Sequence, residues 1–230
     1  WRVLAGCVGA GVALLALGAL GAGPANTGVF LFHVLPALGG GTLYAENQTL
    51  YAFVGRLLAT QLVAKGVNAH YPVLATRTIA GALGLVILAV TALVCWHCRQ
   101  RGLGGALCFV LPMPAALLIV PTAWAHYATW TLLPLAVLAA ALARERLGWP
   151  TVVLFALAAL LVPFGSERDV WRTAGAHDGA IRLVLTYKAY GLLALWAGCA
   201  LAAWRLRHLP AARTTAEREH ATALFVGDRG

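Results

Sequence analysis

Long apolar runs, separated by short polar segments, make up most of the chain. Six of these runs approach the roughly 20 mainly apolar residues that a bilayer-spanning helix needs. They cover residues 3–22, 78–97, 104–121, 128–143, 150–164 and 183–204. The pattern predicts an all-α, polytopic membrane protein with about six transmembrane helices.

The composition agrees with this prediction. Of the 230 residues, 61% are hydrophobic and 11% are charged, and the mean hydropathy is +0.80. Soluble domains carry about 25% charged residues, so we expect no soluble domain. We expect residues 1–205 to form a transmembrane helical domain and residues 206–230 to form a cytoplasmic tail. Because the first apolar run begins almost at Trp1, we also expect this chain to be the C-terminal part of a longer protein.

Short basic loops predict the orientation in the membrane. Arginine pairs follow the second, fourth and sixth runs, at Arg99 and Arg101, Arg144 and Arg146, and Arg205 and Arg207. Short loops rich in Lys and Arg stay in the cytoplasm. Both termini are therefore expected to be cytoplasmic, and three loops are expected outside, at residues 23–77, 122–127 and 165–182.

The net charge of +9 does not indicate a nucleic-acid partner. The basic residues are scattered at the ends of the apolar runs instead of gathering on one face. Anionic lipid headgroups attract such residues, by about 1 kcal/mol each. We expect membrane lipids as partners and no nucleic acid.

Five cysteines are present, and two of them form the segment Cys95-Trp-His-Cys98. A redox Cys-x-x-Cys normally opens a helix after a strand, and a zinc site needs four ligands at matched spacing. Here the pair ends an apolar run instead, which favours structural thiols. No metal site and no cofactor are predicted, while a requirement for a divalent metal stays open.

The first outer loop, residues 23–77, is far longer than an ordinary connection of about 4–6 residues, and it is too apolar to be disordered. We expect it to pack as two short interfacial helices. The first would be capped by Thr27 and bent at Pro36. The second would follow Asn47, where apolar residues recur with helical spacing, at Leu50, Phe53, Val54, Leu57 and Leu58.

The start of the second helix carries the polar run Glu46-Asn47-Gln48-Thr49. Asn47 is predicted to cap the helix, with Thr49 and Arg56 on its polar side, where the helix N-terminus could bind a phosphate at the headgroup level. The alternative is an ordinary interfacial helix whose Arg56 reaches toward the headgroups.

A second cluster lies in the segment 117–134. Three prolines, Pro112, Pro114 and Pro121, are predicted to kink or break the third run. The aromatic residues Trp124, His126, Tyr127 and Trp130 follow at the predicted outer interface. An aromatic belt explains such rings, and Trp130 in particular. His126 is expected to point either into a cavity or at headgroups.

Lys188 lies inside the sixth run, between Tyr187 and Tyr190. A charge at the bilayer centre costs up to about 2.5–3.5 kcal/mol, so an intramembrane cation is treated as a functional-site hypothesis. A lipid phosphate is its natural partner on this side of the membrane. The alternative is a lysine that reaches back to the interface.

Two of these segments resemble one enzyme family. The segment "FHVLPALGGGTLYAENQTLYAFVGRLL", followed by "LLIVPTAWAHYATWTLLPL", resembles the C-terminal half of the polyprenyl-phosphate-mannose-dependent alpha-1,2-mannosyltransferases, glycosyltransferase family 87. That family carries an N-Q-S-L element with a following Arg, and later an S-P-x-S-W-x-H-H element. The matching residues here are Asn47, Gln48, Thr49, Leu50, Arg56, Pro121, Trp124 and His126. Val120 and Tyr127 replace a Ser and the second His.

The resemblance covers roughly residues 1–205. It implies a multi-span fold of the C class of glycosyltransferases, in a bacterial-type cell membrane, with an extracytoplasmic active site. The implied partners are a polyprenyl-phosphate sugar donor, with mannose the expected sugar, and a glycan or glycolipid acceptor. The resemblance implies donor-binding or substrate-binding roles for Asn47, Gln48, Thr49, Arg56, Trp124 and His126. Tyr127 and Lys188 join these candidates from their positions in the sequence, and no family motif covers them.

The chemistry needs a carboxylate base and cations that stabilise the leaving phosphate. Candidate cations are Arg56, Arg77, Lys188 and His126. The resemblance implies a base upstream of Trp1, and Glu46 is the one carboxylate within a matched motif and a weak candidate. The alternative to an enzyme is a non-catalytic polytopic protein that binds or transports lipids.

Overall fold

The computed structural model describes residues 2–60, 70–98, 102–123, 125–163 and 181–207, and the regular elements within them are helices. In chain order these are α1 (Arg2–Ala22), α2 (Pro24–Val29), the π-helical turn η1 (Phe30–Val34), α3 (Leu35–Leu38), α4 (Leu50–Leu58), α5 (Val73–Cys98), α6 (Leu103–Val110), α7 (Pro112–Ile119), the 3-10 segment η3 (Ala125–Thr131), α8 (Leu132–Arg144), α9 (Trp149–Leu161), α11 (Ile181–Val184) and α12 (Tyr187–Leu206). The predicted basic loop at Arg99 and Arg101, Trp124, most of the outer loop 165–182 and most of the tail 206–230 lie outside the described residues.

Four helical segments are long and apolar enough to cross a membrane: Ala5–Ala22, Val73–Cys98, His126–Arg144 and Tyr187–Leu206. Two further apolar helical segments, Leu103–Ile119 and Trp149–Leu161, are shorter. The all-α membrane class predicted from the sequence is therefore confirmed. The number of six spans stays a prediction, because two of the six predicted runs form these shorter helices.

The third predicted run is broken, as its prolines indicated. Helix α6 ends at Val110 and α7 begins at Pro112, with Leu111 between them. The Leu111 amide still donates to the Leu107 carbonyl at 2.9 Å, whereas Pro112 has no amide hydrogen with which to continue the ladder. Pro121 then lies just beyond the end of α7 at Ile119.

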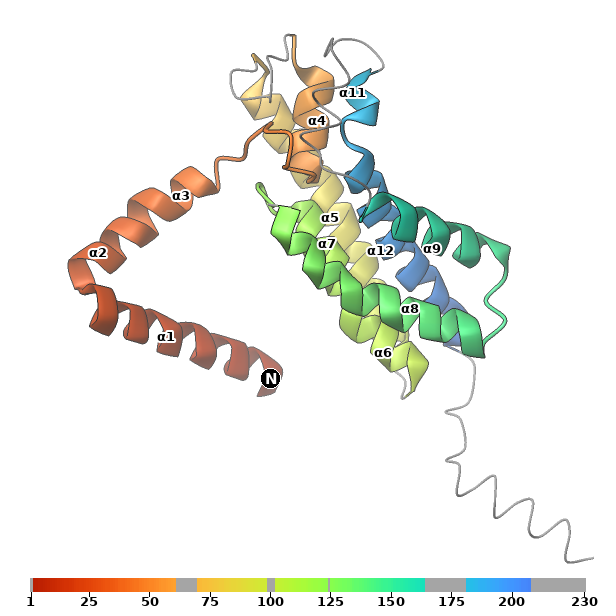
Figure 1. Ribbon diagram of the computed structural model, residues 1–230. Coiled ribbons are helices and arrows are strands. Elements are labelled where there is room, and N and C mark those ends of the chain that lie inside the picture. The colour runs from red at the N-terminus through yellow and green to blue at the C-terminus, as the bar shows by residue number, and fades with distance from the viewer. Residues whose placement is uncertain (1, 61–69, 99–101, 124, 164–180, 208–230) are drawn as a thin grey trace, which may run out of the picture.

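Helix α12 is the central helix of the bundle, and it packs against α5, α6, α7, α8 and α9 (Figure 1). Small residues on α12 allow this close approach. A Cβ atom added to Gly191 would lie 2.9 Å from Val162 Cγ2, and one added to Gly198 would lie 3.0 Å from Leu138 Cδ2. The main core lies along these contacts and includes Leu107, Leu138, Leu195 and Cys199.

The N-terminal helices stand apart from the bundle in Figure 1, and none of the residues in Ala5–Ala22 is buried. The predicted first loop helix forms as α2, η1 and α3, but Thr27 does not cap it. Helix α2 begins at Pro24, whose fixed φ suits the first helical position, and the Thr27 hydroxyl donates to the Gly23 carbonyl within the helix. The π-helical turn η1 lies just before Pro36, where the sequence predicts a bend, and the Leu35 amide there donates to the Phe30 carbonyl. The bend itself stays a prediction.

Candidate functional site

Helix α4 packs over one end of the bundle, against α5 and beside α7 and α11 (Figure 1). Six of its nine residues are buried, from Leu50 to Arg56 with Phe53 excepted. Gly55 makes close packing possible, since a Cβ atom there would lie 2.3 Å from Leu43 Cδ2. Helix α4 is therefore part of the folded bundle, with little of its surface left to face the headgroups.

The cap of α4 is Thr49, so the prediction of Asn47 as the cap is wrong. Thr49 Oγ1 accepts a hydrogen bond of 3.3 Å from the Ala52 amide. The helix begins at Leu50, and a capping side chain belongs to the residue immediately before the first turn. Asn47 lies two residues too early, and its amide makes other bonds.

Asn47 joins the segment before α4 to the segment after α7. Its Nδ2 donates to the Thr42 carbonyl at 2.7 Å and to the Pro121 carbonyl at 2.9 Å, and its Oδ1 accepts from the Ala123 amide at 3.0 Å. The side chain is 2% exposed. All three of these bonds therefore hold main-chain groups.

Gln48 makes the equivalent connection to the start of α12. Its Nε2 donates to the Ala45 carbonyl at 2.8 Å and to the Leu185 carbonyl at 3.1 Å. The side chain is 5% exposed, and its Oε1 has no hydrogen-bond partner among the described residues. One nitrogen atom thus links segments that are 137 residues apart.

Arg56 has no exposed surface, although the helical pattern predicted it on the polar face of α4. Its Nη2 donates to the carbonyls of Tyr44, Ala45 and Asn47, at 2.7, 3.3 and 2.6 Å, and its Nη1 donates to the Leu185 carbonyl at 3.4 Å. The irregular segment 42–49 cannot satisfy these carbonyls by secondary structure, so the guanidinium satisfies them instead. We call Asn47, Gln48, Thr49 and Arg56 the polar clasp.

Beside the polar clasp lie two half-buried charged residues. Glu46 is in the clasped loop, between two residues whose carbonyls bind Arg56. Lys188 is the second residue of α12, with its ammonium group 5.9 Å from the centroid of the Tyr187 ring. Tyr190 contacts Phe53 of α4 edge to face, at 5.8 Å between ring centroids. The start of α12 is therefore packed directly on α4.

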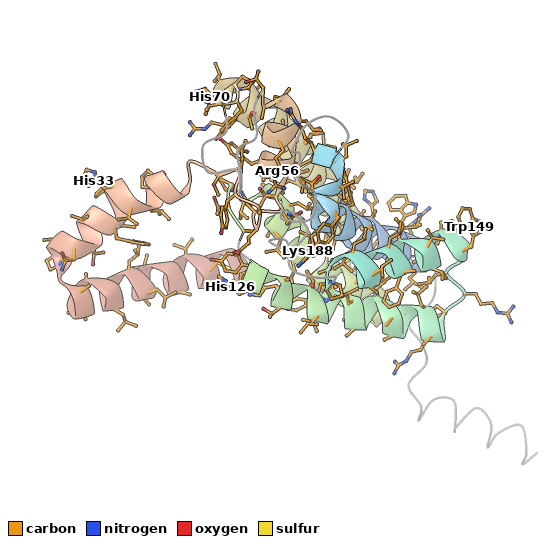
Figure 2. All side chains as sticks on the ribbon, turned by 45° about the horizontal axis from the view of Figure 1, so that its top comes forward. His33, Arg56, His70, His126, Trp149 and Lys188 are labelled. Atoms are coloured by element: carbon orange, nitrogen blue, oxygen red, sulfur yellow. The ribbon has the colours of Figure 1, made fainter. Side chains whose placement is uncertain are left out.

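The other candidate residues lie where α7 leads into η3. His126 is exposed, and its ring centroid is 4.4 Å from that of Tyr127, which in turn is 6.0 Å from that of Trp130. Tyr127 also packs against the core cluster that contains Leu50. Figure 2 shows Arg56 beneath α4, Lys188 on α12 and His126 at the start of the segment leading to α8.

The structure thus brings the three polar segments of the sequence to one end of the bundle. The groups that join them are the main-chain carbonyls of Pro121 and Leu185 and the Ala123 amide. Sequence reasoning missed these groups because every residue has main-chain groups, whatever its side chain. It also missed Gly41, which adopts φ +77° and lies under the Tyr51 ring. The three consecutive glycines were the signal for it.

The geometry gives a rigid polar frame with Glu46, Lys188, His126 and Tyr127 at its edges. Among the described residues, no group of three or more His, Cys, Asp or Glu side chains is arranged to hold a metal ion. Searches against family models, curated proteins and solved structures found no match to this chain.

Proposed function

We propose that this protein is a membrane glycosyltransferase that moves a sugar, mannose in the first instance, from a polyprenyl-phosphate donor to a glycan or glycolipid acceptor on the extracytoplasmic face. The proposal follows the resemblance to glycosyltransferase family 87. In such a transfer the acceptor oxygen bonds to the anomeric carbon of the sugar and gives up its hydroxyl proton to a general base, while the bond from that carbon to the phosphate oxygen breaks. Cations at the site stabilise the phosphate that leaves.

The observation that carries the proposal is the meeting of the two resembling motifs. They are far apart in the sequence, yet Asn47 of the first motif bonds directly to Pro121 of the second. Gln48 and Arg56 of the first motif both bond to Leu185, three residues before Lys188. A substrate site is built from segments held together on rigid elements, and the meeting of these motifs supports the proposal for that reason.

Within the proposal, the polar clasp shapes the site and the residues at its edges contact the substrate. Arg56 is assigned to the frame of the site and not to the phosphate, because its guanidinium binds main-chain carbonyls and has no exposed surface. The half-buried Lys188 and the exposed His126 are the better candidates.

The test is transfer by the full chain reconstituted in lipid nanodiscs, with a synthetic polyprenyl-phosphate-mannose as donor and an alkyl mannoside as acceptor. We expect His126→Ala to reduce transfer at least about tenfold, the effect of losing one hydrogen bond to a charged group. His97→Ala is the matched control. His97 is also exposed and also lies near an aromatic ring, with 5.9 Å between its ring centroid and that of Trp204. It is in the last turn of α5, whereas the candidate site is near the first turns of that helix.

A non-catalytic lipid-binding protein is the second candidate function. It is favoured by the observation that the hydrogen bonds of the Asn47 side chain all go to the chain's own backbone. Binding of the donor lipid without any transfer to the mannoside would establish this second function. If the protein neither binds the donor lipid nor transfers its sugar, both candidates fail.

A further inference from the structure

The segments that carry Glu46 and Lys188 are joined to each other through the polar clasp. The Nε2 atom of Gln48 donates to the carbonyl of Ala45, which precedes Glu46, and to the carbonyl of Leu185, three residues before Lys188. Because these two bonds are 2.8 and 3.1 Å long, the two backbone segments meet within hydrogen-bond reach of one atom. The backbone next to Glu46 and the chain entering α12 are therefore joined at one point, which places the residues that follow on neighbouring segments.

The clasp also holds in place the backbone on which the two charged residues stand. Arg56 binds the carbonyls on both sides of Glu46, at Ala45 and Asn47, so the backbone that carries the carboxylate is immobilised. The same guanidinium binds Leu185 and so helps to fix the start of α12, which carries Lys188. Both charged side chains are half-buried, so each keeps a surface that a ligand can contact.

We propose that these two residues bind opposite ends of one ligand. Lys188 binds the phosphate of a polyprenyl-phosphate sugar, and Glu46 accepts hydrogen bonds from hydroxyl groups of the sugar. This inference rests on the donor class proposed above, and it assigns the orientation of that donor in the site.

The chemistry of the two groups allows this orientation and disfavours the reverse. A carboxylate only accepts hydrogen bonds, and sugar hydroxyls are its natural donors, whereas a phosphate beside Glu46 would be repelled. An ammonium group only donates, and a phosphate oxygen is its natural acceptor.

The experiment compares the affinities of polyprenyl phosphate, polyprenyl-phosphate-mannose and an alkyl mannoside for the full chain in nanodiscs. Lys188→Gln should weaken binding of both lipids about tenfold or more, since a hydrogen bond to a charged group is lost. Glu46→Gln should leave the affinity for polyprenyl phosphate within about twofold of the wild type, or improve it. The gain in affinity that the mannose group gives, measured as the ratio of the affinities of polyprenyl-phosphate-mannose and polyprenyl phosphate, should fall about tenfold.

Matched controls lie at the far end of α8, where Arg144 is exposed and Glu145 is half-buried. Arg144→Gln and Glu145→Gln should change none of the three affinities. Thermal unfolding of each variant verifies that it is folded, and Lys188→Met replaces Lys188→Gln if the glutamine variant is not.

Three outcomes would overturn the orientation: equal weakening of both lipids by Glu46→Gln, an unchanged affinity for polyprenyl phosphate in Lys188→Gln, or a loss of alkyl mannoside binding alone in Glu46→Gln. The last result would assign Glu46 to the acceptor sugar. The function and the orientation fail separately. Sugar transfer by the wild type without the expected split between variants would leave the function standing, whereas the split without transfer would leave a lipid-sugar binding site.

Discussion

The amide of Asn47 donates a hydrogen bond of 2.9 Å to the carbonyl of Pro121, across 74 residues of sequence. The side-chain oxygen of Asn47 accepts from the Ala123 amide in the same segment, so one side chain binds two positions of the turn that follows α7. We expect the position of His126 relative to α4 to depend on these two hydrogen bonds. Each side of the candidate site is therefore set by contacts distant in sequence.

Asn47→Asp should destabilise the protein strongly. The substitution keeps the shape of the side chain but removes the donor to Thr42 and Pro121, and an unsatisfied buried group costs roughly 1–3 kcal/mol. Asn26→Asp is the control, since Asn26 also donates to a carbonyl, that of Ala22, but on an exposed surface. Denaturant unfolding of the purified protein measures both, and equal stabilities would contradict the buried role of Asn47.

Arg56 variants should lose stability in a defined order. Arg56→Met removes every donor to four carbonyls, at roughly 1–3 kcal/mol for each buried group left unsatisfied. Arg56→Lys should lose less, because an ammonium retains donors but lacks the planar fork. Arg77→Met, which removes an exposed arginine 3.5 Å from the Gly40 carbonyl, should fall within about 0.5 kcal/mol of the wild type. A stable Arg56→Met variant would refute this account of the clasp.

Gly41→Ala should cost more than Gly23→Ala. Both glycines have positive φ, +77° and +84°, a backbone conformation that residues with a Cβ atom rarely adopt. The space differs, since a Cβ atom at Gly41 would lie 2.4 Å from Tyr51 Cε1, whereas nothing lies within 4 Å of one at Gly23. The difference in unfolding free energy between the two variants measures the contact with the Tyr51 ring. Equal losses would show that the ring moves aside freely.

The hydrogen bond from Trp196 Nε1 to Thr91 Oγ1, at 2.9 Å, joins α12 to α5. Thr91→Val should destabilise the bundle by about 0.6 kcal/mol, and by no more than about 1.7 kcal/mol, the range for such bonds between membrane helices. Thr78→Val on the same helix is the control, because its hydroxyl bonds only within α5, to Leu74. Steric-trapping or denaturant unfolding in detergent resolves the two, and the interhelical role is rejected if Thr78→Val is the more harmful.

Alkaline pH should weaken the packing of α4 near Tyr71. Burial, reinforced by a hydrogen bond with Tyr51, raises the pKa of Tyr71 to about 12. The unfolded chain loses this proton near pH 10, so the folded state holds it more tightly. The stability that the folded state gains from the protonated Tyr71 hydroxyl is complete below about pH 10 and is lost as the pH rises toward about 12. In Tyr71→Phe the fall in thermal stability over this range should be shallower, and an unchanged slope would refute the assignment.

Much of the helical layout follows from the sequence, because membrane helices leave a strong signal in length and apolarity. The predicted runs 78–97 and 183–204 correspond to α5 and α12, and the break at Pro112 follows from its missing amide hydrogen. The burial of Arg56 could not be predicted, since helical periodicity assigns a charged residue to the polar face. Arg56 is buried because four main-chain carbonyls accept hydrogen bonds from it. Every residue has a main-chain carbonyl, so the sequence does not show which four will be the acceptors.

The cap shows a finer limit of the same kind. Asn47 and Thr49 are both good capping residues, and the choice between them depends on a helix start that a pattern locates only to within about two residues. The Asn47 side chain bonds to Pro121 and Ala123, so contacts distant in the sequence decide which of the two residues caps α4.

The carbonyl of Leu185 receives donors from both Gln48 and Arg56, 137 and 129 residues earlier in the chain. A ribosome finishes the loop around Glu46 long before it reaches Leu185. Throughout that interval Arg56 lacks one of its four carbonyl acceptors, so the clasp can be completed only after the chain has been synthesised as far as α12. Any product terminated before α12 would then display an unfinished loop, a mark by which cellular proteolysis could tell an incomplete chain from a finished one.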